Sequence, residues 1–196
     1  YNHERFVKEC LDSVASQTLK DFEFIIIDDA STDSSQQIIR KWLSQLSLPA
    51  QFIAHSRNVG LCRSLNEAVG QSTGRYLPMG GADDIWLPEK LQRQYIALKD
   101  APDDLAVLYG DAYRIREDGT TMPGMFIESY RPTLKPPSGN IFAELLAGNF
   151  IPAQTTAIRI DAIRAVGGYD ENLAYEDWDM WLRLAARYPL LYVPGD

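Results

Sequence analysis

The sequence is poor in cysteine and histidine, which limits the kinds of site it can build. It has two residues of each type among 196 positions, and Cys10 and Cys62 lie far apart with no paired spacing. This pattern excludes a disulfide framework and gives no zinc motif. With 45% hydrophobic residues, the chain is instead expected to fold around one substantial core in a reducing cytoplasm.

Basic residues are scarce as well. The sequence contains 19 lysines and arginines against 27 aspartates and glutamates, which gives a formal net charge of -8. Such a surface presents no basic field to a nucleic-acid backbone or an anionic membrane, so we expect no nucleic-acid partner. No apolar run approaches the roughly 20 residues that cross a bilayer, and we predict no transmembrane segment in this chain.

The two ends of the sequence indicate a fragment of a longer protein. The chain begins with Tyr1-Asn2 instead of methionine. It stops at residues 192–196, where an apolar strand has just followed a helix. Nothing in the sequence predicts an oligomeric state.

Strand and helix patterns alternate through the first half. Apolar runs predict strands, and 3.6-residue periodicity predicts helices, of which the first is capped by Asn2 and the fourth starts at Pro88. This alternation predicts an α/β fold with a mostly parallel, Rossmann-like sheet flanked by helices. The expected strands are 22–28, 51–55 and 75–79, and the expected helices are 2–17, 31–46, 61–69 and 88–99.

The pattern changes after residue 105. Two strands joined by a turn at Gly119 are followed by a proline-rich loop, and a long apolar-striped helix comes near the end. We therefore expect a nucleotide-binding α/β half at 1–104 and a smaller, mixed acceptor-side half of the same domain at 105–196. The further expected elements are a loop at 131–139, a helix at 141–147, a strand at 155–160 and a helix at 176–187.

Adjacent carboxylates follow two of the expected strands. Asp28-Asp29 come directly after the first strand, and Asp83-Asp84 come a few residues after the third. Ligands collect at the carboxyl ends of parallel strands, so we expect the four carboxylates to converge there around a divalent cation that carries a diphosphate. An ordinary turn or capping role explains Asp28-Asp29 equally well. Asp83 and Asp84 stand too far before Pro88 to cap its helix.

Four ordered stretches together resemble the family 2 glycosyltransferases of the GT-A fold. The resemblance implies an inverting enzyme, of the bacterial polysaccharide or cell-envelope type, that uses Mn²⁺ or Mg²⁺. It would transfer a sugar from a nucleotide-diphosphate sugar, with a UDP-sugar favoured, to a saccharide or lipid-linked acceptor. The stretches are YNHERFVKECLDSV, DFEFIIIDDASTDSS, GRYLPMGGADDIWLPEKL and GGYDENLAYEDWDMWLRLA.

The resemblance carries donor-site roles onto matching positions. Tyr1 matches a tyrosine whose ring packs at the nucleobase, and Asp29 matches an acid that hydrogen-bonds the base. Asp83 and Asp84 match ribose and metal acids, with Asp84 the preferred metal ligand. Many relatives have a further acid where this chain has Gly81, which implies a thinner metal site. Arg63 falls near a basic position that contacts the donor phosphates in relatives, and Arg57 is a competing choice.

The resemblance also implies acceptor-side roles. Asp177 in YEDWDMW matches the general base that deprotonates the acceptor hydroxyl, and Glu176 and Trp178 are candidate acceptor contacts. An alternative explanation of Asp177 remains open, because an acid in the first turn of a helix is favoured by the helix dipole alone. Asp179 is expected to pair with Arg183 one turn later.

Two other functions stay open at this point. A sugar-phosphate nucleotidyltransferase would use a related sheet and metal, but it normally begins with a glycine-rich basic loop that this sequence lacks. A non-catalytic nucleotide-sugar-binding module would have no use for Asp177. The family resemblance further implies a cytoplasmic protein at or near the inner membrane. It also implies an apolar strand before Tyr1, central in the sheet, whose absence would destabilise the chain.

Overall fold

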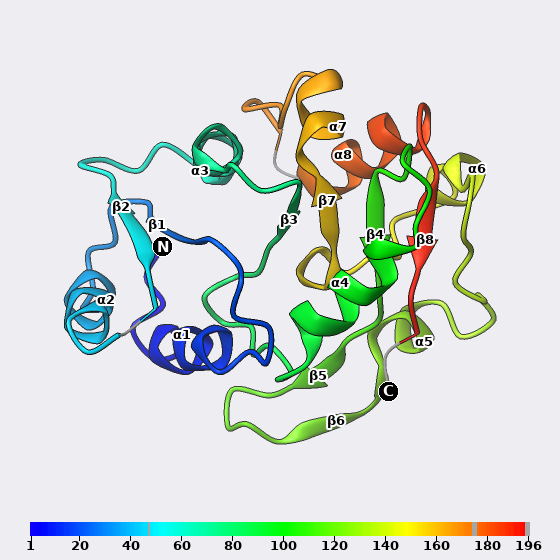
Figure 1. Ribbon diagram of the computed structural model, residues 1–196. Coiled ribbons are helices and arrows are strands. Elements are labelled where there is room, and N and C mark those ends of the chain that lie inside the picture. Colours follow the sequence, from blue (N-terminus) through cyan, green and yellow to red (C-terminus); the bar gives the residue numbers. More distant parts are fainter. Residues whose placement is uncertain (47, 174–175, 195–196) are drawn as a thin grey trace.

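The computed structural model describes residues 1–46, 48–173 and 176–194. Most strands occupy the middle of the molecule, and helices lie on both sides of them (Figure 1). In that view α3 (Leu61–Gln71) lies above the strands and α1 (Val7–Ala15) lies below them. This arrangement confirms the predicted α/β class.

The first block of the molecule is built on two parallel strands. β1 (Phe24–Asp28) pairs with β2 (Ala50–Ala54), and Asp28 lies opposite Ala54. α1 packs against α2 (Ser35–Leu43), and α3 contacts β1. α1, β1 and α2 share a small buried cluster, which consists of Val7, Leu11, Ile26, Ile39 and Trp42.

The second block is built on a four-stranded mixed sheet in the order β3-β7-β4-β8. β7 runs antiparallel to both of its neighbours, whereas β4 and β8 are parallel. All 3 residues of β4 are buried, as expected for an apolar strand covered on both faces. The four strands are β3 (Tyr76–Pro78), β4 (Val107–Tyr109), β7 (Ala157–Arg159) and β8 (Leu190–Tyr192).

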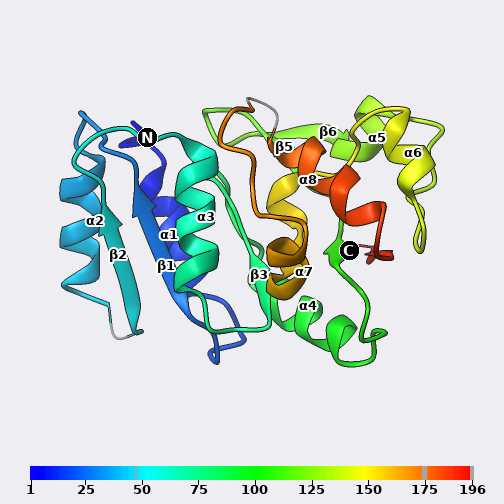
Figure 2. The ribbon, with the colours of Figure 1, turned by 90° about the horizontal axis from the view of Figure 1, so that it is seen from above.

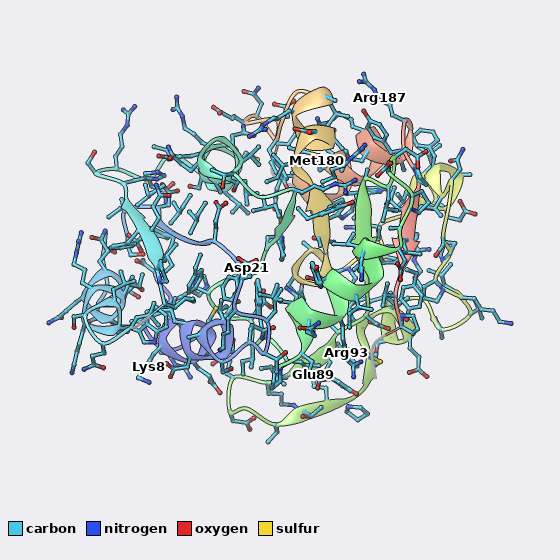
Figure 3. All side chains as sticks on the ribbon, viewed as in Figure 1. Lys8, Asp21, Glu89, Arg93, Met180 and Arg187 are labelled. Carbon is cyan, nitrogen blue, oxygen red and sulfur yellow. The ribbon has the colours of Figure 1, made fainter. Side chains whose placement is uncertain are left out.

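Helices and a hairpin surround the second sheet. Met180 of α8 lies within its core, whereas Lys8 and Arg187 lie at the periphery (Figure 3). The sequence pattern predicted neither α5 nor α7, because both are too short to show a clear helical period. The remaining elements are α4 (Lys90–Lys99), β5 (Tyr113–Ile115), β6 (Thr121–Met125), α5 (Phe126–Tyr130), α6 (Phe142–Leu146), a 3-10 turn (Ala153–Thr155), α7 (Ile160–Ala165) and α8 (Glu176–Ala185).

A groove separates the two blocks. Within the described residues, β1 pairs only with β2 and β3 pairs only with β7, so one edge of each strand faces the other block (Figures 1 and 2). The space between them has a volume of about 730 Å³, and Ile25, Ile27 and Leu77 are among the apolar residues that line it. The additional central strand that the family resemblance implies would lie in this groove, and that strand stays a prediction.

Two predicted helix starts are wrong. α1 begins at Val7, because Asn2 has a φ of 56° and its side chain pairs with Thr32 instead of capping the helix. α4 begins at Lys90, and the Pro88 carbonyl accepts a hydrogen bond from the Thr18 amide. Asp83 and Asp84 are therefore even further from a capping position. No helix in the described ranges is long and apolar enough to cross a membrane.

Candidate active site

Asp28 ends β1 and organises the turn that follows it. Its side chain is buried and accepts hydrogen bonds from the Ser31 amide, the Ser31 hydroxyl and the Gln36 side chain. The turn also places Ala30 at a φ of 62°. Asp28 therefore has the turn role that was given as an alternative. Both of its carboxylate oxygens accept hydrogen bonds from neighbouring residues of the protein.

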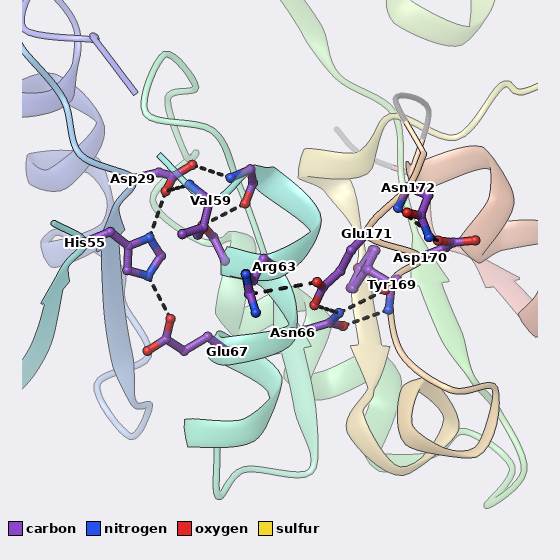
Figure 4. A network of polar contacts seen from close by, with 12 residues as sticks. Asp29, His55, Val59, Arg63, Asn66, Glu67, Tyr169, Asp170, Glu171 and Asn172 are labelled. Atoms are coloured by element: carbon purple, nitrogen blue, oxygen red, sulfur yellow. Dashed lines mark hydrogen bonds and ion pairs between the residues drawn. The ribbon is translucent and has the colours of Figure 1, made fainter. Parts of the chain in front are cut away.

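Asp29 lies beside His55 at the ends of the two parallel strands. One carboxylate oxygen lies 2.8 Å from His55 Nδ1 and accepts the Val59 amide at 2.8 Å, and the other accepts the Gly60 amide at 2.8 Å (Figure 4). Although burial opposes it, these hydrogen bonds lower the pKa of Asp29. A carboxylate has about four lone-pair sites. Asp29 therefore keeps one acceptor site open on the oxygen that binds Gly60.

Residues 1–3 connect the loop after β1 with the loop after β3. The Asn2 amide donates to Ser31 Oγ at 2.9 Å, and the Asn2 side chain accepts from the Thr32 amide at 2.9 Å. His3 Nε2 lies 3.9 Å from Asp83. Tyr1 is 54% exposed and lines the groove between the blocks. Two carboxylate-bearing loops, distant in sequence, thus meet around the first residues.

Asp84 and Asp83 lie in a tight loop over Gly81. Asp84 accepts the Gly81 amide at 2.7 Å, and burial, together with the neighbouring Asp83 charge, raises the pKa of Asp84. A Cβ on Gly81 would lie 2.6 Å from an Asp83 oxygen and 3.2 Å from an Asp84 oxygen. Glycine at this position therefore lets both carboxylates fold over the backbone.

The expectation that four carboxylates converge is wrong. Asp28 and Asp29 accept hydrogen bonds from their own block. In the part of the chain that the structure describes, no group of three or more His, Cys, Asp or Glu side chains is arranged to hold a metal. Asp83 and Asp84 nevertheless fit a cation, because they are adjacent and because Asp84 is a half-buried acid that a positive charge would stabilise.

A lysine whose Nζ is buried and a thiol lie behind this loop, and the sequence analysis assigned neither to the site. Lys90 Nζ lies 3.2 Å from the centre of the Trp86 ring, and burial lowers the Lys90 pKa to about 7 against the opposing effect of Asp84. Cys10 Sγ contacts the Gly81 carbonyl at 3.3 Å. Burial, Asp84 and Asp83 raise the Cys10 pKa to about 12. Cys10 therefore supports this loop from α1.

Asp177 lies in the first turn of α8. It accepts the Asn149 side-chain amide at 3.0 Å and the Trp178 backbone amide at 2.7 Å. Burial, Glu176 and Asp177 together raise the pKa of the Tyr169 hydroxyl, which contacts Met79 at 3.8 Å just after β3. Tyr169 thus links the surroundings of Asp177 to the strand that leads into the Asp83-Asp84 loop.

The other acceptor-side residues divide between surface and core. Glu176 is half-buried, and Trp178 is 36% exposed with its Nε1 donating to the Leu145 carbonyl at 2.8 Å. Trp181 is fully buried. The predicted pair of Asp179 and Arg183 is confirmed by an Nε–Oδ2 distance of 2.8 Å.

Arg63 extends from α3 towards the second block. Its guanidinium forms an exposed ion pair with Glu171 at 3.9 Å. The neighbouring Asn66 holds the same segment more firmly, because its side chain donates to the Tyr169 carbonyl at 2.9 Å and accepts the Tyr169 amide at 2.8 Å (Figure 4). α3 therefore connects the two blocks, and a phosphate-binding role of Arg63 stays a prediction.

Sequence reasoning missed the residues that hold the predicted site residues in place. His55 was not assigned to the site, but the parallel register that sets Asp28 beside Ala54 sets Asp29 beside His55. The register of the two parallel strands could therefore have predicted the contact between Asp29 and His55. Glu67 and Asn149 gave none, because their contacts with His55 and Asp177 depend on the tertiary fold.

Comparison with known proteins identifies the family. The model of the Glycosyl transferase family 2 matches residues 1–166. An uncharacterised glycosyltransferase of Methanocaldococcus jannaschii is 32% identical over 189 residues, which are 95% of this chain and 62% of that protein. EpsE of Bacillus subtilis is provisionally named a glycosyltransferase. It is 29% identical over 187 residues, which are 93% of this chain and 63% of EpsE.

Solved structures show the same fold. The mannosyltransferase PcManGT of Pyrobaculum calidifontis, in complex with GDP-Man and Mn²⁺, has a TM-score of 0.74 at 19% identity and covers 100% of this chain with 52% of its own. TarS 1–349 of S. aureus, in complex with UDP, has a TM-score of 0.71 at 21% identity, covering 100% of this chain with 58% of its own. The predicted GT-A fold is thereby confirmed, and the chain belongs to glycosyltransferase family 2.

Proposed function

We propose that the chain is the catalytic domain of an inverting glycosyltransferase. It moves a sugar from a nucleotide-diphosphate sugar to an acceptor hydroxyl. The observation that carries the proposal is the pairing of two carboxylate sites: the Asp83-Asp84 loop after β3, and Asp177 held by Asn149 at the start of α8. The contact between Met79 and Tyr169 joins the two.

The donor nucleotide lies at the ends of β1 and β3 in this proposal. The exposed Tyr1 ring packs on the base, and the remaining acceptor site of Asp29 takes a base N–H, as uracil would offer. Asp83 accepts the ribose hydroxyls, and Arg63 approaches the phosphates. A UDP-sugar is favoured; TarS has been solved with UDP and UDP-GlcNAc, and PcManGT with GDP-Man.

A divalent cation, Mn²⁺ or Mg²⁺, would be held by Asp84 and Asp83. When bound, it stabilises the negative charge of the departing diphosphate. The raised pKa of Asp84 supports this role, because it marks a carboxylate without enough compensating positive charge. The absence of a side chain at Gly81 leaves two protein carboxylates for the ion, which predicts a modest metal affinity.

Asp177 acts as the general base. It takes the proton of the acceptor hydroxyl as that oxygen attacks the anomeric carbon from the face opposite the diphosphate, which inverts the configuration. Asn149 orients the carboxylate, and Glu176 and the exposed indole of Trp178 contact the acceptor. The acceptor class is a saccharide or a lipid-linked sugar of polysaccharide or cell-envelope synthesis, which would place the protein in the cytoplasm near the inner membrane.

The test is turnover of nucleotide sugars. The protein is incubated with UDP-, GDP- and dTDP-sugars, with Mn²⁺ or with chelator, and release of the nucleoside diphosphate is followed. We expect one donor class to be consumed in a metal-dependent reaction and Asp84→Asn to lose that dependence together with most of its activity. Release of pyrophosphate from a nucleoside triphosphate and a sugar phosphate would instead identify a nucleotidyltransferase, and binding without turnover would identify a module.

A further inference from the structure

Both ring nitrogens of His55 face carboxylates. Nδ1 lies 2.8 Å from Asp29 at the end of β1, and Nε2 lies 2.8 Å from Glu67 on α3 (Figure 4). The His55 and Asp29 side chains are each 12% exposed, and Glu67 is 37% exposed. The His55 backbone amide also donates to the Asp28 carbonyl at 2.9 Å, which fixes the ring at the strand ends.

The number of protons decides the state of this cluster. A neutral imidazole has one N–H and one lone pair, whereas two ionised carboxylates need two donors. Hydrogen bonds to Asp29 and then Glu67 raise the pKa of His55 above its ordinary value. These two carboxylates are the charged groups that face the ring, one from β1 and one from α3. The arrangement of the two carboxylates therefore favours the imidazolium form, which can donate a hydrogen bond to each of them.

Asp29 transmits the position of this ring to the loop before α3. Besides His55, it binds the amides of Val59 and Gly60, and its carbonyl accepts the Asn58 side chain at 3.2 Å. Gly60 has a φ of 93°, so the loop turns sharply at this contact. If the Asp29 side chain rotates, the amides of Val59 and Gly60 lose their shared anchor.

We propose that His55 is a positioning residue for the donor nucleotide: its doubly hydrogen-bonded ring holds Asp29 and residues 58–60 in the arrangement that receives the base. The inference rests on the proposed function of this site. Loss of the ring proton removes one of the two hydrogen bonds and leaves two negative carboxylates around a neutral ring. The open acceptor site of Asp29 then no longer has a fixed direction, and nucleotide affinity falls.

The direction of the pH effect follows from the His55 contacts. Because the folded-state pKa is raised, the anchored state is fully present below the ordinary histidine value and is lost as the pH rises through the folded value. Removing the Glu67 charge lowers the folded pKa. The loss of nucleotide affinity should then begin at lower pH.

The experiment measures calorimetric binding of UDP, GDP and dTDP with Mg²⁺ between pH 5.5 and 8.5. For the nucleotide that binds, we expect the affinity of the unaltered protein to fall about tenfold over this range, the scale of one charge-assisted hydrogen bond. His55→Gln should bind weakly at every pH, and Glu67→Gln should shift the fall to lower pH. Asp161→Asn, which removes an exposed acid from the first turn of α7, should retain the pH profile.

A second readout does not depend on the ligand. NMR titration of the His55 ring in the free protein should give a pKa above about 6.5 that falls in Glu67→Gln. Nucleotide binding with the same pH profile in His55→Gln, or a ring pKa at or below the ordinary value, would overturn the inference and leave the proposed function intact. Failure of the unaltered protein to bind any nucleotide would overturn both. Thermal melting of each variant checks that it is folded.

Discussion

The two blocks of the molecule carry different parts of the site on different kinds of support. The second block has a large core in which β4, β7 and the inner face of α8 are buried, and Asp177 extends from that rigid base. The first block has a small buried cluster, and its β1 is only partly covered. There Asp29 is positioned by hydrogen bonds with His55, Val59 and Gly60. Apolar packing therefore fixes the side that carries the proposed base, and a polar network fixes the side of the proposed nucleotide site.

The difference in core size is tested by two tryptophans. Trp181 is fully buried in the large core, so Trp181→Ala should cost about 4 kcal/mol of unfolding free energy. Trp42 is 9% exposed in the small cluster, and Trp42→Ala should cost clearly less. Urea unfolding of both variants gives the two values. Equal costs would show that the cores support the fold equally.

The next largest predicted effect is a rise in melting temperature when the groove between the blocks is filled. Joining about ten residues that include an apolar strand to the chain before Tyr1 should raise the melting temperature by more than about 5 °C, because the strand would pair with the free edges of β1 and β3. A polar, glycine-rich extension of equal length is the control. An apolar extension that leaves the melting temperature unchanged would show that the two edges do not accept a strand.

Asn66 tests the link between the blocks. Asn66→Ala leaves the Tyr169 amide and carbonyl without their side-chain partner and should cost about 2 kcal/mol. Asn172→Ala is the matched control, because among the described residues Asn172 forms its hydrogen bonds with nearby Asp170, and the change should cost less than about 0.5 kcal/mol. Chemical denaturation compares them. Similar losses in both variants would show that α3 does not hold the second block.

The smallest predicted effect is the pH dependence of stability. The raised His55 pKa contributes stability at low pH that is lost as the pH rises through its folded value, and the lowered Asp29 pKa contributes stability that is lost as the pH falls through its folded value. Because Glu67 is partly exposed, we expect the His55 contribution to stay below about 1 kcal/mol. Melting curves of the unaltered protein and of His55→Gln should converge as the pH rises; curves that separate further would contradict this assignment.

The sequence predicts the existence of most helices and strands well, because their signals are local. The apolar run of β1, the α3 stripe and the acid-rich start of α8 each lie within one stretch of chain. Helix starts were predicted less well, since Asn2 binds Thr32 across 30 positions instead of the adjacent helix.

The site could be predicted only as a set of separate residues. The motifs gave Asp29, Asp83, Asp84 and Asp177, but not the groups that hold them. The contact of Asn149 with Asp177 spans 28 positions, and that of Asn66 with Tyr169 spans 103. Such contacts depend on how strands pair and helices dock, and no local period encodes them. The division at residues 104 and 105 stays a prediction, although β3 and β7 from opposite sides of it pair directly.

The central claim is that Asp177 is a base and not only a favourable acid at a helix start. The measurement compares Asp177→Asn with Asp161→Asn, which removes an exposed acid from the first turn of α7. We predict that Asp177→Asn binds the donor nucleotide normally while its kcat falls about 10²- to 10⁴-fold, and that Asp161→Asn keeps full activity. Transfer that continues at the unaltered rate in Asp177→Asn would contradict the account.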